Sequence, residues 1–341
     1  MPVRTDRAFA DGPLPWSRAW ALAATGRHGF WTDGPGSSGP AAHFRTSTHV
    51  GAAFAGALLV LLHQIDARLG HPPRLDVVDL GGGSGELLTS LLALADGDAG
   101  LAGRLRAVAV DVRTRPAGLD PRISWVRGLV PDAAPRSVTG LLLAHELLDE
   151  VPLDVVEVDA DGRQRLVLVG ADGHESWGGA PSDVRDLEWL ERWWPAASPG
   201  ERAEVGRPRD TLWARCVARL GSGTALAVDY GHTTGDRTSG RYADGTLTAY
   251  RDGRPTRPVP DGRVNLTAHV AVDSVAAAVG GSVTCQRDAL RALGLCGALP
   301  ASGLAAHDPA AYTDALVEAC DAAELLDPSG LGAFAWVRVD R

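Results

Sequence analysis

The stretch VVDLGGGSGELLTSLL, Val77 to Leu92, decides the fold of this chain of 341 residues. A short apolar run enters a cluster of four glycines, and the cluster opens directly into a leucine-rich pattern with helical spacing. Glycine permits a turn with positive φ and lets a ligand approach the backbone closely. The helix behind such a turn also presents unpaired N–H groups. The stretch therefore predicts a strand, a ligand-binding turn and a helix in direct succession.

The spacing of these glycines argues against a dinucleotide ligand. A GxGxxG pattern starting at Gly81 would need glycine where Glu86 stands, and the carboxylate of Glu86 would repel a pyrophosphate group. The residues present instead form an acidic-x-GxGxG pattern over Asp79, Gly81, Gly83 and Gly85. We therefore expect this turn to bind a different kind of cofactor.

The segments around the turn alternate between strand and helix patterns. Short apolar runs that read as buried strands are separated by segments with helical periodicity, which is typical of a parallel sheet covered on both faces. We expect an α/β doubly wound, mostly parallel sheet. The predicted strands cover residues 75–80, 104–112, 123–128, 140–148, 224–231 and 332–340.

Helix signals flank this alternation. Ser47 or Thr48 is predicted to cap a helix that runs to about Leu69, and the fourth strand is expected to lead into a helix. Residues 166–180 read as a hairpin and residues 183–194 as a helix, both within a segment that interrupts the alternation.

We divide the chain into four segments on this basis. An N-terminal helical segment covers 1–70, and the first part of the sheet, with the cofactor site, covers 71–155. An inserted subdomain covers 156–205, and the second part of the sheet, with the substrate-facing loops, covers 206–341.

Composition limits the partners and the compartment. The net charge of -9 comes from 42 acidic and 33 basic residues, all of them arginine, and the dispersed arginines form no nucleic-acid footprint. The four cysteines form no CxxC pair, and the longest apolar run, residues 50–62, is too short to span a bilayer. No secretion signal is visible at the N-terminus. We expect a cytoplasmic protein with no nucleic-acid or membrane partner, and a homodimer is left open.

The acidic glycine-rich pattern resembles motif I of the S-adenosylmethionine-dependent methyltransferases. The resemblance implies that S-adenosylmethionine is the cofactor and S-adenosylhomocysteine the product, with Asp79 near the cofactor's ammonium group. It also implies that Asp111, at the end of the next strand, accepts hydrogen bonds from the ribose hydroxyls. Thr46 and Ser47 are expected to contact the cofactor's carboxylate, or else to cap a helix.

Several segments in the correct order resemble one branch of these enzymes, the MidA family, which includes the arginine methyltransferase of mitochondrial complex I assembly. HFRTSTHVGAAF (43–54) is similar to the family's DFxTSxxVSxxF, AHELLDEVPLDVVEV (144–158) to NELxDAxPV, and NLTAHVAV (265–272) to DLTAHVDF. The resemblance covers nearly the whole chain. It implies a Rossmann-like class I methyltransferase that methylates arginine.

Three positions depart from the family pattern. The asparagine before Glu146 is His145 here, an acidic residue is replaced by His49, and an Asp-Phe pair is replaced by Ala271-Val272. The cofactor motifs are thus retained, whereas positions expected to face the acceptor have changed.

The candidate catalytic residues follow the fourth predicted strand. A guanidinium stays charged near neutral pH, so carboxylates must orient it by bidentate hydrogen bonds. Glu146 and Asp149 are the candidates for this clamp, and His145 is expected to line the pocket. His145 and Asp149 lie four residues apart, as in a helical metal-binding pair, but the second histidine of such a motif is missing. We predict no metal site.

Substrate contacts are predicted on two other segments. Asp229 and Tyr230 end the fifth core strand, at the carboxyl edge where ligands of such sheets bind. His269 lies in one of the segments that resemble the MidA family, which implies substrate binding or loop bracing there.

Three functions remain open from the sequence. The first is N-methylation of arginine in a protein or peptide. The second is methylation of a small molecule or natural product on the same fold, which the changes at His49, His145 and Ala271 would favour. The third is a non-catalytic assembly factor that binds the cofactor and transfers nothing.

Overall fold

The computed structural model of this protein describes residues 8–38 and 46–341. The beginning of the segment 43–54, which resembles the family, therefore lies outside the described residues. The remainder of that segment is described below.

A central sheet of seven strands organises the molecule. Six strands point in the same direction, and β17 is inserted antiparallel between β10 and β16. This confirms the predicted α/β class with a mostly parallel sheet. In sheet order the strands are β16 (Ser282–Cys285), β17 (Ala335–Asp340), β10 (Leu220–Asp229), β5 (Val138–His145), β2 (Leu75–Leu80), β3 (Leu105–Asp111) and β4 (Ser124–Arg127).

Helices cover both faces of this sheet, which explains why its central strands are apolar along their whole length. One face is covered by α2 (Ala53–Arg68), α3 (Glu86–Ala95), α9 (Gln286–Ala292) and α11 (Pro309–Leu326), and the other by α6 (Arg207–Val217) and α8 (Val272–Val279). The short helices α4 (Ala99–Ala102) and α10 (Ser302–His307) follow α3 and precede α11.

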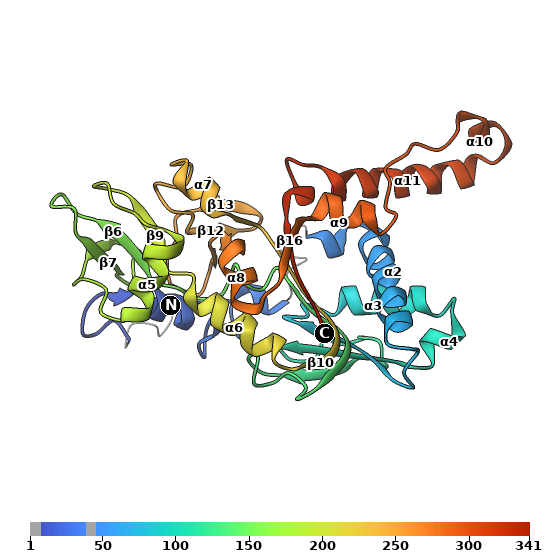
Figure 1. The fold of residues 1–341 in the computed structure, drawn as a ribbon, viewed down its shortest axis with the longest axis horizontal. Coiled ribbons are helices and arrows are strands. Elements are labelled where there is room, and N and C mark those ends of the chain that lie inside the picture. The colour runs from blue at the N-terminus through green and yellow to red at the C-terminus, as the bar shows by residue number, and fades with distance from the viewer. Residues whose placement is uncertain (1–7, 39–45) are drawn as a thin grey trace.

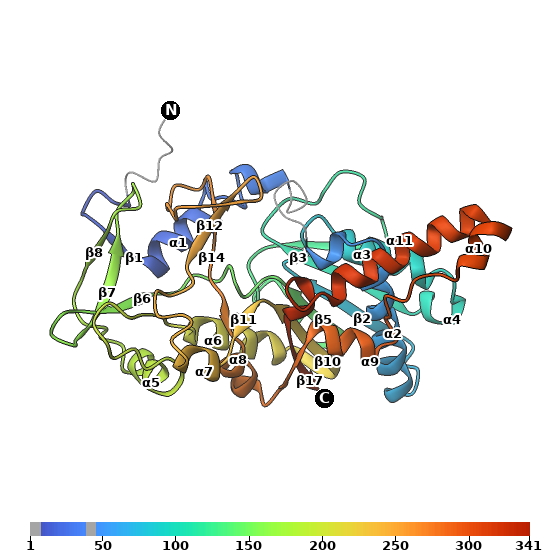
Figure 2. The same ribbon diagram turned by 90° about the horizontal axis from the view of Figure 1, so that it is seen from above.

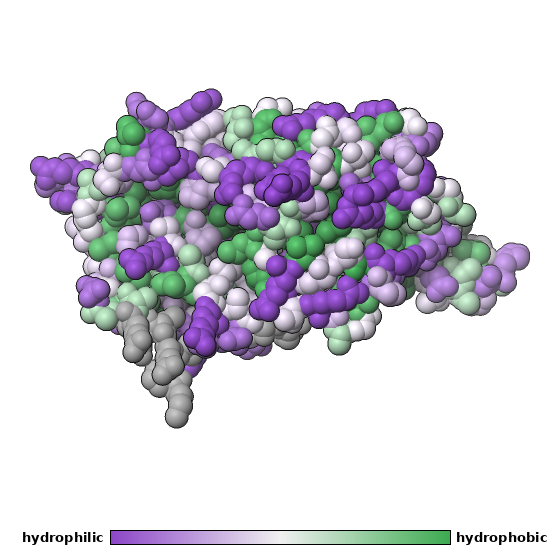
Figure 3. Space-filling view, turned by 90° about the horizontal axis from the view of Figure 1, so that it is seen from below, coloured by the Kyte–Doolittle hydropathy of each residue, from purple (hydrophilic) through white to green (hydrophobic). Residues whose placement is uncertain are grey.

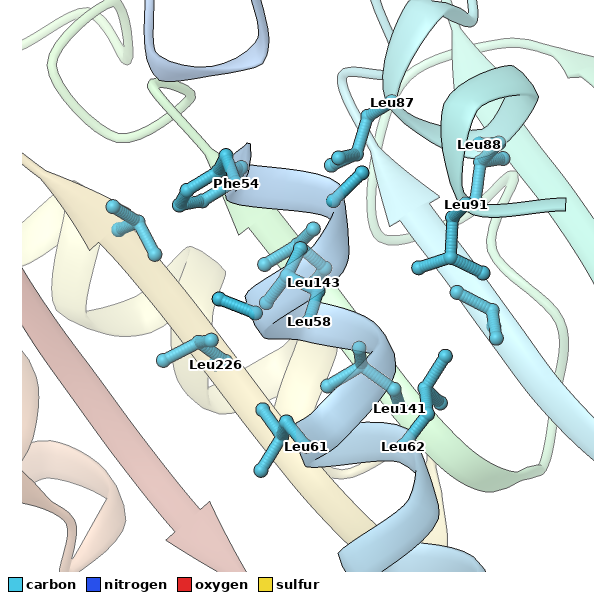
Figure 4. Packing of buried hydrophobic residues seen from close by; sticks show 14 of the residues in the cluster. Phe54, Leu58, Leu61, Leu62, Leu87, Leu88, Leu91, Leu141, Leu143 and Leu226 are labelled. Carbon is cyan, nitrogen blue, oxygen red and sulfur yellow. The ribbon is translucent and has the colours of Figure 1, made fainter. Parts of the chain in front are cut away.

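Helix α2 shows how the core is packed. Leu58, Leu61 and Leu62 of α2 are fully buried and lie over Leu141 of β5 and Leu226 of β10 (Figure 4). Burying a leucine side chain contributes about 1.5–3 kcal/mol. The helix therefore packs across the strands, and its first turn reaches the carboxyl end of β5, where the ring centres of Phe54 and His145 are 5.1 Å apart.

Smaller sheets form a second part of the molecule, on the left of Figure 1 and Figure 2. One sheet has the order β1-β7-β6-β9 with β8 paired to β7, and the other has the order β13-β12-β14. The predicted hairpin is confirmed as β7 and β8, and the predicted helix as α5. The strands are β1 (Leu14–Pro15), β6 (Val155–Val158), β7 (Gln164–Val169), β8 (Glu175–Trp177), β9 (Arg202–Glu204), β12 (Thr248–Arg251), β13 (Arg254–Thr256) and β14 (Asn265–Thr267).

Three parts of the chain share this second core. Helix α1 (Trp16–Thr25) packs with β6, β7 and β14 in one hydrophobic cluster. Helix α5 (Val184–Trp193) packs on β6 and β9 through Trp189 and Leu190. The pair β11 (Gly231–His232) and β15 (Val270–Ala271), with α7 (Thr234–Thr238), connects this part to the central sheet. The division at 70, 156 and 205 stays a prediction.

Two predicted helix boundaries are wrong. Ser47–His49 form a single 3-10 turn, and α2 begins only at Ala53. Strand β5 does not lead into a helix, because Glu146 adopts a left-handed φ of 48° and a turn follows. The carboxylate of Asp229 accepts hydrogen bonds from the N–H groups of Leu148 and Asp149 at 2.9 and 3.2 Å. These two backbone donors are therefore paired by a tertiary contact and not by the hydrogen bonds of a helix. His145 and Asp149 therefore share no helix face.

One element projects from the body of the molecule. Helix α10 buries no residue, and α11 buries residues only in its C-terminal half, so both extend from the body at the right of Figure 1. Hydrophilic side chains are scattered among apolar ones on the face in Figure 3. Within residues 8–38 and 46–341, no helix is long and apolar enough to cross a bilayer.

Candidate functional site

A cavity of about 810 Å³ lies at the carboxyl ends of the central strands. Its described wall includes the glycine turn after β2, Asp111 at the end of β3 and the loop after β5. The second part of the molecule completes the wall with residues of α1, β12 and β14. Ligands of open α/β sheets bind at this edge.

The glycine turn supplies bare backbone to the cavity. Gly81, Gly83 and Gly85 all have positive φ, at 74°, 59° and 82°. Gly81 and Gly83 line the cavity, and a Cβ on Gly81 would lie 2.9 Å from the side chain of Leu147. Gly85 is the N-cap of α3 and is absent from the described cavity wall. Its positive φ therefore serves the conformation of the turn and not a direct contact with the cavity.

Asp79 lies in the cavity beneath this turn. Its side chain is buried, and burial, with the charges of Asp111 and Glu86, raises its pKa to about 8. A buried carboxyl group surrounded by other acids is stabilised when a cation binds beside it. The predicted contact with an ammonium group fits this environment.

Asp111 ends β3 and is already hydrogen bonded within the chain. Its Oδ1 accepts the backbone N–H and Nε of Arg113 at 2.9 and 3.0 Å, while Oδ2 accepts Nη2 of Arg113 at 3.0 Å and the N–H of Gly83 at 3.1 Å. Arg113 is buried, and its guanidinium lies 5.7 Å from the Trp31 ring centre. Ribose hydroxyls would therefore have to replace some of these bonds.

Arg113 was not predicted, although its position two residues after a strand-ending aspartate allows a local ion pair. The residues around the turn nevertheless suit S-adenosylmethionine: the backbone is open at Gly81 and Gly83, and an acidic group at Asp79 matches a cationic amino acid moiety. The bonds between Asp111 and Arg113 are the one feature that must rearrange for the predicted ribose contact.

At the 3-10 turn before α2, one of the two predicted cofactor residues faces the cavity and the other faces the protein interior. Thr46 lines the cavity and caps the turn, with its Oγ1 3.0 Å from Nδ1 of His49. Ser47 is fully buried, and its hydroxyl accepts a hydrogen bond from Gln286, so this side chain faces the protein interior. His49 places Nε2 3.8 Å from Glu86 Oε1, which joins the turn to the start of α3.

Glu146 and His145 lie together on the cavity wall at the end of β5. Nε2 of His145 is 3.6 Å from Oε1 of Glu146, and neither atom has a hydrogen-bond partner among the described residues. Burial, followed by the charge of Asp149, raises the pKa of Glu146 well above its usual value. Burial lowers the pKa of His145 to about 3, so the imidazole is neutral.

Asp149 is held by two hydroxyl groups. Its Oδ2 accepts hydrogen bonds from Tyr230 and from Thr267, the latter at 2.7 Å. Its Oδ1 is buried and has no hydrogen-bond partner in the described part of the chain. Burial is the main cause that raises the pKa of Asp149. One carboxylate oxygen of Asp149 is therefore held by hydroxyl groups, and the other has no hydrogen-bond partner in the described ranges.

The remaining predicted substrate residues have different positions. Tyr230 and His269 line the cavity with their rings 5.3 Å apart, and Phe334 packs 5.5 Å from Tyr230. Asp229 is buried and does not appear in the described wall, because its carboxylate binds the N–H groups of Leu148 and Asp149. Asp229 thus supports the loop that carries Glu146.

Two charged residues near this loop escaped the sequence analysis. Arg209 of α6 is buried, and its guanidinium donates to the carbonyls of Asp149, Ala268 and His269 at 2.7, 3.0 and 2.8 Å. Glu150 lines the cavity and accepts a hydrogen bond of 2.7 Å from Asn265. A buried arginine in a helix carries no sequence signal, but a third acid after Glu146 and Asp149 could have been noticed.

Metal chemistry has no built site in the described ranges. Within residues 8–38 and 46–341, no group of three or more histidines, cysteines, aspartates and glutamates is placed to hold a metal ion. The carboxyl groups of Glu146 and Asp149 face a cavity beside aromatic rings instead. This arrangement can bind and orient a cationic group next to the glycine turn.

Comparisons with known proteins agree with this geometry. Two crystal structures of a COG1565 superfamily protein from Burkholderia thailandensis, one bound to S-adenosylhomocysteine and one native, share 23% sequence identity with this chain. They align with TM-scores of 0.76 and 0.75 and cover 99% of this chain and 90% of theirs, which shows a common class I methyltransferase fold. No curated protein matches the sequence.

A family model covers residues 55–289 and is described as "Putative S-adenosyl-L-methionine-dependent methyltransferase". This range is more than half of the 341 residues and includes the glycine turn, Asp111 and the loop after β5. The predicted resemblance and the predicted cofactor are thereby confirmed. The chain belongs to the MidA family of S-adenosylmethionine-dependent methyltransferases.

Proposed function

We propose that this protein transfers a methyl group from S-adenosylmethionine to a nitrogen of arginine in a protein or peptide. The observation that carries the proposal is the pair of buried carboxyl oxygens, Glu146 Oε1 and Asp149 Oδ1, which have no partners among the described residues and belong to side chains of the cavity wall. Buried carboxylates are stabilised by paired cations, and a guanidinium offers five N–H donors in a planar fork.

The chain's own residues have distinct roles in this proposal. Glu146 and Asp149 orient the guanidinium, while Tyr230 and Thr267 fix the Asp149 carboxylate by their hydroxyl groups. S-adenosylmethionine supplies the electrophilic methyl group when bound and leaves as S-adenosylhomocysteine. The nitrogen that takes the methyl group would lose one N–H proton to the carboxylate of Glu146 or Asp149. Holding the nitrogen in line with that group is the main source of acceleration, since correct positioning can remove about 7–11 kcal/mol from a bimolecular barrier.

The cofactor contacts are part of the same proposal. Asp79 would hold the ammonium group, and the turn at Gly81 and Gly83 would carry the cofactor along its backbone. Asp111 would accept hydrogen bonds from the ribose hydroxyls after Arg113 shifts, and Thr46, which lines the cavity, would contact the cofactor's carboxylate.

A small-molecule acceptor is the second candidate. His145 lies beside the clamp at 3.6 Å from Glu146, where the family pattern has asparagine, and a neutral imidazole there changes the shape and hydrogen bonding of the acceptor site. The cofactor and the acceptor must also share a cavity of about 810 Å³, which is a size typical of small-molecule sites.

Methyl-labelled cofactor distinguishes these candidates. Purified protein is incubated with it and with lysate from a strain that lacks the gene, and the labelled products are separated before acid hydrolysis. Label recovered as methylarginine supports the proposal. Label confined to the small-molecule fraction overturns it in favour of the second candidate, and no label despite bound S-adenosylhomocysteine favours the non-catalytic assembly factor.

Substituting Glu146→Gln tests the clamp itself. We expect kcat/KM to fall roughly 100-fold, because an amide keeps the shape but loses the charge that orients the guanidinium. The affinity for S-adenosylhomocysteine should stay within about twofold of the wild type, since the tested contact is with the acceptor. Glu191→Gln, on the exposed face of α5, is the matched control. Wild-type kcat/KM in the Glu146 variant would remove the clamp from the mechanism.

A further inference from the structure

The loop after β5 carries three carboxyl groups, and each is attached to a different neighbour. Glu146 lies 3.6 Å from His145 at the end of β5. Asp149 is held by hydroxyl groups, and Glu150 accepts the 2.7 Å hydrogen bond from Asn265 in β14. All three residues line the cavity. The acidic groups therefore extend from the central sheet to the small sheet of β12–β14.

The cavity wall offers little positive charge to balance them. Arg113 is the one arginine in the described wall, and it is bonded to Asp111 by two side-chain N–H groups. The sequence contains no lysine. Burial, with the charges of Asp149 and Glu146, raises the pKa of Glu150 well above its usual value, and a cation bound beside Glu150 would favour its charged form. A single guanidinium bound by Glu146 and Asp149 would leave the third carboxyl group without a cation.

The neighbours of Glu150 form a small site of their own. Tyr250 of β12 is the direct cross-strand partner of Asn265 in β14, and cross-strand partners have Cβ atoms about 4.5–5.5 Å apart. Both residues line the cavity with Glu150. Asn265 donates to Glu150 and is the cross-strand partner of Tyr250, so a carboxylate and an aromatic residue lie on the same part of the cavity wall, and both kinds of group attract cations.

We infer that the methyl acceptor carries a second cationic group, and that Glu150, supported by Asn265 and Tyr250, binds it. The inference rests on the proposed function, because it takes the guanidinium at Glu146 and Asp149 as the first cation. The acceptor class is thus a dication: a basic peptide with a second positive charge near the arginine, or a small guanidine that also carries an amine. Glu150 is a specificity-determining residue in either case.

Binding of simple guanidines tests this without knowledge of the natural acceptor. Calorimetry would compare aminoalkylguanidines with two to six methylenes against alkylguanidines of the same length, on protein saturated with S-adenosylhomocysteine. We expect the best aminoalkylguanidine to bind at least about tenfold more tightly, because only this class offers an ammonium group to Glu150, and hydrogen bonds between charged groups are stronger than neutral ones. In Glu150→Gln this advantage should fall to about twofold or less.

Controls distinguish a failure of the second cation site at Glu150 from a failure of the guanidinium clamp at Glu146 and Asp149. Glu191→Gln should keep the advantage of the dication, and Glu146→Gln should weaken both classes of guanidine. Equal binding of the two classes to the wild type, or an unchanged advantage in Glu150→Gln, overturns the second cation and leaves the clamp in place. Failure of both classes to bind the wild type overturns the clamp and this inference with it. The wild-type comparison is informative even if the Glu150 variant does not fold.

Discussion

Asp79 combines a structural cost with its predicted function. Its carboxyl group is buried with the acidic residues Asp111 and Glu86 nearby, and its pKa is about 8. An aspartate in an unfolded chain titrates near pH 3.9. Between these values the folded protein holds a proton that the unfolded chain has lost, so folding becomes less favourable as the pH rises. A cation bound beside Asp79 would remove this penalty.

Substituting Asp79→Asn should therefore stabilise the protein at high pH. Near pH 4 both proteins carry a neutral group at this position, and their melting temperatures should be similar. As the pH rises to about 8 the wild type loses stability relative to the variant, and above this value the difference should become constant. Thermal melts of both proteins from pH 4 to pH 9 measure this. A melting difference that does not grow with pH would show that Asp79 ionises freely in the folded state.

Among single residues, the sequence identified the acids of the site better than their partners. Asp79, Asp111, Glu146 and Asp149 all line the cavity. The ion pair between the Arg113 guanidinium and the Asp111 carboxylate was not predicted, because it depends on the path of the chain after β3. Patterns of acids and glycines are visible in a sequence, whereas the rotamer that pairs two charges is not.

At the scale of elements, the loop between β5 and β6 depends on contacts from outside itself. The Asp229 carboxylate at the end of β10 accepts its N–H groups, and Arg209 of α6 binds the carbonyls of Asp149 and Val151 at 2.7 and 3.3 Å. Arg209 also donates to the carbonyls of Ala268 and His269, which ties this loop to the segment after β14. Two cavity-lining segments are thus aligned by one buried side chain.

Arg209→Met should lower the free energy of unfolding by about 3–5 kcal/mol. The substitution leaves buried carbonyl groups without hydrogen-bond donors and removes the positive charge beside the buried carboxyl groups of Asp149 and Asp229. Arg209→Lys should lose less, since an ammonium keeps the charge but cannot reach every carbonyl at once. Urea unfolding measures both effects. Arg163→Met is the matched control, because Arg163 is exposed and a change there should stay within about 0.5 kcal/mol. A comparably small loss in Arg209→Met would mean that the loops hold their shape without it.

Two predicted elements, the helix after β5 and the start of the helix before the glycine turn, differ from the structure. The strand predicted over 140–148 was expected to lead into a helix, but β5 ends at His145, and Glu146 has a left-handed φ of 48° that is followed by a turn. The helix before the glycine turn begins later than expected because Ser47 to His49 form a separate 3-10 turn. After β5, the N–H groups of Leu148 and Asp149 bind the distant carboxylate of Asp229, whereas the 3-10 turn is capped locally by Thr46 and His49.

At the scale of the whole molecule, the cavity is built by two cores that meet at the carboxyl edge of the central sheet. Phe54 and Leu58 of α2 belong to the core beside the sheet, whereas Trp16 and Trp20 of α1 belong to the core of the small sheets. Trp16 donates to Glu175 at 2.7 Å, and Glu175 also pairs with Arg202, so α1 is fastened to β8 and β9. The cavity wall contains residues from both cores, such as Leu87 and Ala24.

Product binding should accordingly stabilise the folded molecule. S-adenosylhomocysteine at about 100 times its Kd should raise the free energy of unfolding by about 2.7 kcal/mol, which corresponds to a melting shift of several degrees. Differential scanning calorimetry with and without the ligand measures the shift. Asp79→Asn should lose most of it because the ammonium contact is gone, and Glu191→Gln should retain it. A full shift in Asp79→Asn would remove Asp79 from the cofactor site.

The sequence by itself determined the α/β class, the strand-turn-helix unit at Val77–Leu92, the cofactor and the family, because these depend on local periodicity and on motifs in chain order. Only the tertiary structure decided that the side chains of Asp229 and Ser47 face the interior. It also decided that Arg113 forms an ion pair with Asp111 and that Glu150 accepts a hydrogen bond from Asn265. Each of these contacts joins side chains whose positions depend on how separate elements pack. Local preferences define the elements, but hydrogen bonds and charges between distant residues determine which side chains face the cavity.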